Sequence, residues 1–384
     1  MTSLPQPSAE HLAHSVQVAE AIRAEIVAAG GWIAFSRYME MALYAPGLGY
    51  YSAGLQKFGA GGDFVTAPEI SSLFGRTLAR QAAQIIQASA GDVLELGAGT
   101  GRLAVQLLGE LERLEALPQR YLILEVSAHL RTVQRETIVR ELPPALVERV
   151  QWLERLPTDF SGCIIANEVL DALSVHVISS HQDGIYERGI GIEGDGFGWQ
   201  ERKLEAGVLH DIARELKLPA DYMTEVCLAL PALIASLADV LQRGAMLLID
   251  YGFPRSEYYH PQRGGGTLMC HYRHLAHDNP LLFPGLQDIT AHVDFTGVAE
   301  AGVKHGLQVL GYTSQAQFLI NSGITDLLSR ISPSDAASYL PLAAEAQKLL
   351  SPAEMGELFK VIALGKGLEQ PLQGFTRGDK RHAL

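Results

Sequence analysis

The sequence predicts an α/β protein with a mostly parallel sheet and helices on both faces of that sheet. Between residues 92 and 166, short apolar runs alternate with segments whose apolar residues recur at helical spacing. Such an alternation is typical of parallel strands joined by crossover helices. Hydrophobic residues make up 47% of the 384 residues and charged residues 19%, so the chain has enough apolar material for a sizeable core.

Residues 1–90 are expected to form a helical N-terminal region with a glycine-rich loop. From Ser15 to Ala29 the apolar residues recur at the spacing of an amphipathic helix, which Gly30 and Gly31 would end. Residues 45–70 are rich in glycine and contain two prolines, which predicts a long irregular segment. Such loops are often functional, although a simple linker would have the same composition.

The first part of the sheet is expected in residues 91–173. Three glycines separate its first strand from its first helix, and the last apolar run of this part ends at Asn167. The predicted strands are Asp92–Leu96, Tyr121–Val126, Val150–Leu153 and Cys163–Ala166, and the predicted helices are Leu103–Leu114 and Leu130–Glu141.

Residues 174–230 are expected to be an antiparallel insertion with some helix, because the pattern changes there to polar and apolar residues in alternation. Its exposed strand edges would allow a partner-binding surface or a homodimer contact. The alternating runs are Val175–Ser179, Tyr186–Ile192 and Phe197–Lys203, and glycine-containing turns separate them.

The second part of the sheet is expected in residues 231–323, and residues 324–384 are expected to be a helical C-terminal segment and tail. A helix from Pro231 to Arg243 would lead to a strand from Ala245 to Asp250. Thr290–Phe295 and Gln308–Tyr312 are predicted as the last two strands, with a helix between them.

Composition excludes several classes of protein. Thirty basic and 43 acidic side chains leave a formal charge of −13, which gives no reason to expect binding to nucleic acid or to an anionic membrane. The most apolar stretch without charge, Val226–Ala238, has 13 residues, whereas about 20 are needed to cross a bilayer. The start of the chain lacks the features of signal and transit peptides, so a cytoplasmic protein is expected.

Histidines offer two further candidates. His271, His274 and His277 do not match the spacing of a zinc-binding H-E-x-x-H helix, and no metal site is expected. His292 lies in DITAHVDF (288–295), which alternates like a strand. It is either a proton acceptor or a hydrogen-bonded strand residue.

The segment DVLELGAGTGRLA (92–104) is the strongest local signal for a ligand. It places Gly97, Gly99 and Gly101 between a strand and a helix, where a ligand can approach the backbone closely. Glu125 ends the next predicted strand, 24 residues after Gly101, and is placed to accept hydrogen bonds from two ribose hydroxyls. Together these features indicate an adenosine-containing cofactor.

Two details decide between cofactors. Arg102 stands where the dinucleotide fingerprint needs a small residue, which disfavours nicotinamide cofactors. Glu95 precedes the first glycine, and a carboxylate there would repel a pyrophosphate but attract the ammonium and sulfonium groups of S-adenosylmethionine. The alternative is that Glu95 is an ordinary surface carboxylate at the end of a strand.

The segment IIANEVLDALSVHV (164–177) supplies a second group of candidates, at the carboxyl end of a predicted strand. Asp171 would share one side of a first helical turn with either Glu168 or Asn167, three and four residues earlier, and the pair could converge on one substrate cation. Paired carboxylates suit a guanidinium, whose planar fork takes bidentate hydrogen bonds. Alternatively, Asn167 or Asp171 simply caps the next helix.

With these motifs the chain resembles the MidA-like family of S-adenosylmethionine-dependent methyltransferases, whose mitochondrial members are complex I assembly factors that methylate a protein arginine. The resemblance rests on segments in the family's order along nearly the whole chain. They are FSRYMEMALYAPGLGYYS, GDFVTAPEISSLFGRTLA, ELGAGTGRLA, ANEVLDALSVHV, LLIDYGFP, GTLMCHYRHLAHDNP, DITAHVDFTGVA and FKVIALGK.

The resemblance implies a class I methyltransferase core, which is Rossmann-like, with a helical N-terminal part and an inserted substructure. It implies that S-adenosyl-L-methionine is held by Glu95, Gly97, Gly99, Gly101 and Glu125, and that Asn167, Glu168 and Asp171 face the methyl-acceptor pocket. The loop with Asp63, Thr66, Pro68 and Glu69 is similar to the family's lid, and Thr66 and Pro68 are expected at the cofactor.

The expected function is therefore methyl transfer to a protein side chain of a partner, an arginine guanidinium by the resemblance alone. A small-molecule methyltransferase and a non-catalytic assembly factor or chaperone that retains the cofactor fold are the alternatives. A nicotinamide-dependent oxidoreductase is disfavoured by Arg102.

Overall fold

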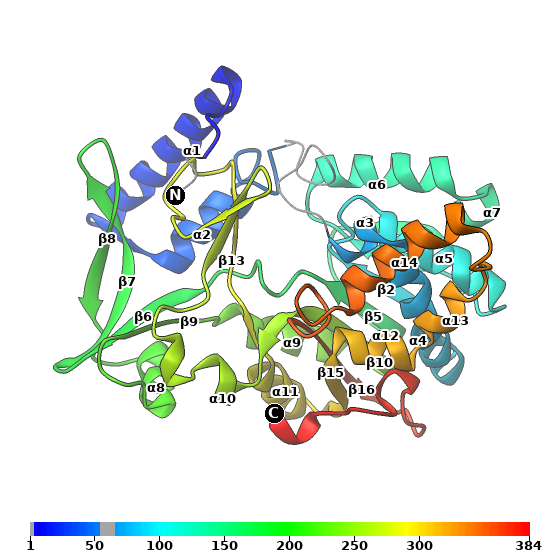
Figure 1. Ribbon diagram of the computed structural model, residues 1–384. Coiled ribbons are helices and arrows are strands. Elements are labelled where there is room, and N and C mark those ends of the chain that lie inside the picture. Colours follow the sequence, from blue (N-terminus) through cyan, green and yellow to red (C-terminus); the bar gives the residue numbers. More distant parts are fainter. Residues whose placement is uncertain (1–3, 54–65) are drawn as a thin grey trace. The chain divides into compact units, whose positions relative to one another are not determined.

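The computed structural model describes residues 4–53 and 66–384, and the chain divides into two compact units (Figure 1). Unit 1 contains residues 1–64, 171–230 and 255–292, and unit 2 contains residues 65–170, 231–254 and 293–384. Each unit is thus assembled from three separate stretches of sequence. Within the described residues, no helix is long and apolar enough to cross a membrane.

Unit 2 is built on an eight-stranded sheet. Five strands in the order β10-β5-β2-β3-β4 are parallel, β16 and β15 continue the sheet in antiparallel fashion beyond β10, and the short β14 pairs with the end of β10. The strands are β2 (Asp92–Leu96), β3 (Tyr121–Leu124), β4 (Val150–Leu153), β5 (Phe160–Asn167), β10 (Leu241–Phe253), β14 (Val293–Asp294), β15 (Gln308–Ser314) and β16 (Phe359–Lys366).

Consecutive residues of the central strands are buried, as in a sheet that is covered on both faces. Val93 and Ile165 pack in the same core as helices α4 and α5, whereas their neighbours Leu94 and Ile164 point to the opposite face and are equally buried. The helices of unit 2 are α3 (Ala67–Ile70), α4 (Ser72–Ser89), α5 (Arg102–Arg113), α6 (Ala128–Glu141), α7 (Pro144–Val147), α9 (Ala229–Val240), α11 (Phe295–Lys304), α12 (Gln315–Asn321), α13 (Ile324–Leu328) and α14 (Ala336–Leu350), with 3-10 turns at Gln373–Phe375 and Arg381–Ala383.

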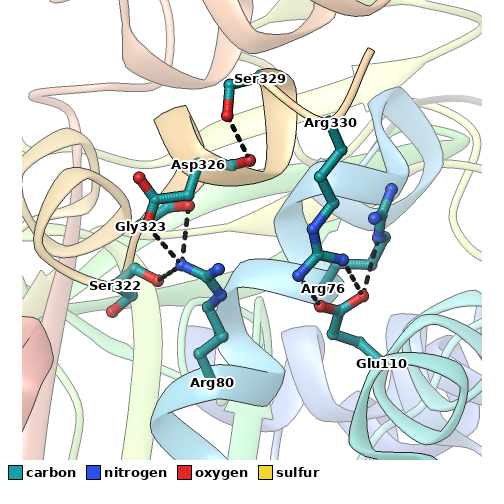
Figure 2. A network of polar contacts seen from close by, with 8 residues as sticks. All are labelled: Arg76, Arg80, Glu110, Ser322, Gly323, Asp326, Ser329 and Arg330. Carbon is teal, nitrogen blue, oxygen red and sulfur yellow. Dashed lines mark hydrogen bonds and ion pairs between the residues drawn. The ribbon is translucent and has the colours of Figure 1, made fainter. Parts of the chain in front are cut away.

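The C-terminal helices α13 and α14, orange in Figure 1, pack on α4. Figure 2 shows two polar clusters at this contact. Glu110 of α5 is 1% exposed and lies 2.8 Å from the Arg330 guanidinium, while the Arg76 Nε donates to its other oxygen at 3.2 Å. The Arg80 guanidinium bonds to Asp326 Oδ2 at 3.0 Å and to the Gly323 carbonyl at 3.1 Å. These ion pairs tie the C-terminal segment to the core.

Unit 1 contains two antiparallel sheets. The larger has the order β1-β7-β6-β9, with β8 beside β7, and the smaller has the order β12-β11-β13. Its elements are α1 (Ala9–Ala28), β1 (Trp32–Ala34), α2 (Phe35–Tyr44), β6 (His176–His181), β7 (Gly184–Glu193), β8 (Gly196–Lys203), α8 (Val208–Leu216), β9 (Tyr222–Val226), α10 (Arg255–Tyr258), a 3-10 turn at Pro261–Arg263, β11 (Met269–Tyr272), β12 (Leu275–His277) and β13 (Asp288–Thr290).

The predicted N-terminal region and the predicted insertion fold together within unit 1. Trp32 of β1 pairs with Gly191 of β7, and the Phe35 ring of α2 stacks on Trp199 of β8 at 4.9 Å. Residues 66–90, which were expected in the N-terminal region, belong to unit 2. The division of the structure therefore follows other boundaries than the five predicted segments.

In the last third of the chain one strand prediction was wrong and one strand was missed. Thr290–Phe295 is not one strand, because the chain leaves the small sheet of unit 1 at Thr290 and joins unit 2 at Val293. The alternation of this segment is also not realised, since Asp288 and Thr290 are as buried as Ile289. In the C-terminal segment, β16 lies inside the sheet, whereas a helical segment and tail without a strand were predicted there.

Candidate active site

Three glycines carry the chain from β2 into α5. Gly97, Gly99 and Gly101 have φ values of +60°, +53° and +86°, a region that residues with a Cβ rarely adopt. The turn is also closely packed. A Cβ on Gly97 would lie 3.1 Å from Val169 Cγ2, and one on Gly101 would lie 3.1 Å from the Gln134 Cα. The glycine turn therefore touches both the segment after β5 and helix α6.

Glu125 follows β3 directly and is buried beside this turn. Its Oε1 accepts the backbone N–H of Ser127 at 2.8 Å, and its Oε2 accepts the Gln134 side chain at 2.9 Å. The Gln134 amide also donates to the Gly99 carbonyl at 3.1 Å and accepts the Trp152 indole N–H at 3.0 Å. These contacts fix the Glu125 carboxylate beside the glycine turn.

Glu95 is the fourth residue of β2 and is only 2% exposed, so the alternative of a surface carboxylate is wrong. The Tyr121 hydroxyl donates to Glu95 Oε2 at 2.6 Å. Burial raises the pKa of Glu95 from 4.5 to about 7; the Tyr121 hydrogen bond opposes this shift, and the nearby charge of Glu125 adds to it. A cation close to Glu95 would reverse the shift, because it would favour the charged carboxylate.

Thr66 and Pro68 lie at the short helix α3, whose first residue is Ala67, and Asp63 lies outside the described residues. Glu69 of this helix accepts a hydrogen bond from the Thr100 hydroxyl in the glycine turn. The Gln106 side chain of α5 donates to the Pro68 carbonyl at 2.7 Å. The C-terminal end of the predicted lid segment is therefore attached to the glycine turn and to α5.

Asn167 is the last residue of β5, and Glu168 follows it with a φ of +55°. Glu168 Oε1 accepts the Asn167 side-chain amide at 3.0 Å and the backbone N–H of Ala67 at 3.3 Å. The Oδ1 of Asn167 is buried and has no hydrogen-bond partner among the described residues. The structure thus brings Asn167 and Glu168 together beside the start of α3.

The predicted helical turn after Asn167 was wrong. Residues 168–173 form bends and turns, so neither Asn167 nor Asp171 caps a helix. The physical reason is the backbone of Glu168, whose φ of +55° lies outside the right-handed helical region. Its N–H donates to the Ile249 carbonyl of β10, and the N–H groups of Val169 and Leu170 donate to the Asp250 carboxylate.

Asp171 belongs to unit 1, where it is buried and its carbonyl accepts the Ala291 N–H at 3.0 Å. It lies near Tyr51, whose hydroxyl donates to Asp288 Oδ1 at 2.8 Å. The pKa of Tyr51 is well above its ordinary value, mainly through burial and further through the charges of Asp288 and Asp171. This carboxylate and tyrosine cluster was not predicted, although Asp288 lies in a motif that the sequence singled out.

The histidine candidates also lie in unit 1. The backbone N–H of His292 donates to the Thr267 hydroxyl at 3.0 Å, and desolvation lowers the pKa values of His271 and His277. Among the described residues, no group of three or more histidine, cysteine, aspartate or glutamate side chains is arranged to hold a metal ion.

The comparisons with known proteins identify the family and the cofactor. A family model of S-adenosyl-L-methionine-dependent methyltransferases matches residues 77–313. The chain belongs to this family. Its cofactor is therefore S-adenosyl-L-methionine, as the motifs predict, and its sheet is that of a class I methyltransferase.

Two kinds of relative are similar to this methyltransferase over most of its length. A protein from Burkholderia thailandensis, whose crystal structure was determined with S-adenosyl-homocysteine bound, is 51% identical with a TM-score of 0.97, and the match covers 100% of both chains. The zebrafish (Danio rerio) protein arginine methyltransferase NDUFAF7, mitochondrial, is 30% identical over 91% of this chain and 90% of its own. The Drosophila melanogaster homologue is 28% identical over 97% and 92%.

Three residues of the candidate site escaped the sequence analysis. Tyr121 and Gln134 hold the two carboxylates, and Asp250 holds the segment after Asn167. Tyr121 and Gln134 lie in a predicted strand and a predicted helix, where nothing in the local pattern separates them from packing residues. Asp250 had a signal, because it is a charged residue at the end of an apolar strand.

Proposed function

We propose that this methyltransferase methylates a protein side chain, and that the acceptor is an arginine guanidinium. The observation that carries the proposal is the pair at the end of β5, where the buried, unpaired Oδ1 of Asn167 lies beside the Glu168 carboxylate. Both groups accept hydrogen bonds, and a guanidinium offers five N–H donors in a planar fork. The names of the mitochondrial relatives, which are protein arginine methyltransferases, support the same acceptor.

In this proposal the cofactor lies along the glycine turn, where Gly97, Gly99 and Gly101 leave room for it. Glu125 accepts the ribose hydroxyls, and Glu95 offsets the positive charge of the methionyl end. Thr66 and Pro68 border the same site through α3. The position of Glu125 beside the glycine turn and the burial of Glu95 fit such a ligand.

Asn167 and Glu168 would orient the acceptor nitrogen and stabilise the guanidinium charge. When bound, the cofactor supplies an electrophilic methyl group on a sulfonium. Glu168 would take the proton that the nitrogen loses as its bond to the methyl carbon forms. Asp171 is kept as a further acceptor residue on the strength of the family resemblance alone.

The test is transfer of tritiated methyl groups into an extract of cells that lack this gene. We expect label in one protein band with the wild-type chain and none with Glu168→Gln, which should still bind S-adenosyl-homocysteine in calorimetry. Label only in small molecules would discard the protein acceptor and keep the enzyme class. If neither the wild-type chain nor Glu168→Gln transferred label although both bound S-adenosyl-homocysteine, the result would favour a non-catalytic assembly factor.

The homodimer and the cytoplasmic location remain predictions. Sedimentation of the purified chain and fractionation of the source cells would test them.

A further inference from the structure

Asp250 lies in β10, three residues before Phe253, the last residue of this strand, and β10 is next to β5 in the sheet. Ile249 is in register with Asn167, so Asp250 stands beside the first residue after β5. Its side chain is fully buried, with 0% exposure. Oδ2 accepts the backbone N–H groups of Leu170 at 2.9 Å and Val169 at 3.2 Å, and Oδ1 accepts that of Tyr251 at 2.9 Å.

Glu168 has a backbone conformation that needs such support. Its φ of +55° lies in the left-handed region, where a Cβ clashes with the backbone, and only the surrounding structure can hold it there. The N–H of Glu168 donates to the Ile249 carbonyl at 2.9 Å, and the next two N–H groups donate to Asp250. Three successive amides are therefore fixed by two neighbouring residues of β10.

The direction of the Glu168 side chain follows from this backbone. In the left-handed conformation its carboxylate meets the Asn167 amide and the Ala67 N–H. A helical or extended residue at position 168 would point its side chain elsewhere. The contact of Val169 with the glycine turn would also change, because Val169 Cγ2 lies 3.1 Å from the position of a Cβ on Gly97.

We propose that Asp250 is a positioning residue of the methyltransferase, which holds Glu168 in the left-handed conformation and so directs its carboxylate to the acceptor. The inference rests on the proposed function, which places Asn167 and Glu168 at the acceptor. The requirement is for acceptor atoms: both oxygens of Asp250 face N–H groups. In Asp250→Asn, one of them becomes an NH2 group that faces an N–H donor instead.

Asp250→Asn is the variant that tests the proposal, and Glu110→Gln is its matched control. Glu110 is also a buried carboxylate of unit 2, but it contacts Arg330 and Arg76, and no residue of the segment 167–170 (Figure 2). Both changes replace a buried carboxylate by its isosteric amide, and both should lower the thermal midpoint. Only Asp250→Asn should alter the segment after β5.

Three measurements on the full chain are compared: hydrogen exchange of residues 168–170, affinity for S-adenosyl-homocysteine, and the rate of tritiated methyl transfer into the extract. For Asp250→Asn we expect faster exchange at Val169 and Leu170, cofactor affinity within about threefold, and turnover lower by about 10- to 100-fold, as for a displaced catalytic group. Glu110→Gln should keep wild-type turnover within about twofold.

Wild-type turnover of Asp250→Asn, or an equal loss of turnover in Glu110→Gln, would overturn the proposal. Unchanged exchange at residues 168–170 would overturn it as well. If the wild-type chain transfers no methyl group, the proposed function fails. The exchange measurement then still decides whether Asp250 holds Glu168.

Discussion

Replacing Glu95 by Gln should make the stability of unit 2 less dependent on pH. The folded chain raises the pKa of Glu95 from 4.5 to about 7, mainly through burial. Below about pH 4.5 the carboxyl is protonated in the folded and in the unfolded chain, so no stability is lost there. As the pH rises from about 4.5 to 7, the unfolded chain releases the proton first, and the free energy of unfolding falls.

The size of the effect follows from the shift. One pKa unit corresponds to about 1.36 kcal/mol, so the ionised form of Glu95 costs the folded state about 3 kcal/mol above pH 7. Glutamine cannot ionise, and its carbonyl oxygen can still accept the Tyr121 hydroxyl. The stability of Glu95→Gln relative to wild type should therefore increase by about 3 kcal/mol between pH 4.5 and pH 8.

The assay is urea unfolding, followed by the fluorescence of Trp152 in a background where Trp32 and Trp199 are replaced by Phe. Trp152 reports on unit 2, and the other two tryptophans of the chain lie in unit 1. Parallel pH profiles for the two chains would refute the reasoning, because they would show that Glu95 titrates at its ordinary pKa.

Three further substitutions have definite expected outcomes. Gly101→Ala should destabilise unit 2 by about 1–2 kcal/mol and weaken cofactor binding in calorimetry, because φ is +86° and the Cβ would press on Gln134; unchanged affinity would contradict this. Gln134→Ala should weaken binding of S-adenosyl-homocysteine by about tenfold, since Glu125 loses a hydrogen bond that orients it. If Gln134→Ala bound S-adenosyl-homocysteine as tightly as the wild type, the prediction would be wrong. Glu110→Gln should lower the free energy of unfolding by about 2 kcal/mol. This is less than the 3–5 kcal/mol expected for a fully buried ion pair, because the side chains of Arg330 and Arg76 are 35% and 23% exposed. An unfolding midpoint in urea equal to that of the wild type would show that Glu110 does not stabilise the fold.

The parallel part of the sheet could be predicted from the sequence because its signals are local. Asp92–Leu96 is a strand with the predicted ends, and the helices after the glycine turn and after Glu125 begin within two residues of their expected positions. Apolar runs between glycine turns and helix-periodic segments repeat there over short distances. The antiparallel character of β6, β7 and β8 was likewise predictable from alternation and turn residues.

The errors concern partners that are distant in sequence. β16 is an apolar run after helices, and it becomes a strand by pairing with β15 and with β10, which ends more than 100 residues earlier. In the site, a turn replaces the predicted helix because Glu168 has a left-handed backbone conformation. Contacts with β10 accompany this conformation, and Asp250, which accepts the Leu170 N–H, lies 80 residues later in the sequence. The types of residue at the site were predictable from motifs, whereas the conformation of Glu168 depends on β10, which no local pattern reveals.

The central claim, a protein arginine as methyl acceptor beside Asn167 and Glu168, is tested most directly by mass spectrometry of the protein band labelled by the wild-type chain. The account predicts a mass increase of one or more methyl groups on an arginine of that protein, absent after incubation with Glu168→Gln. Methyl groups on another type of residue, or an unchanged product from Glu168→Gln, would contradict it.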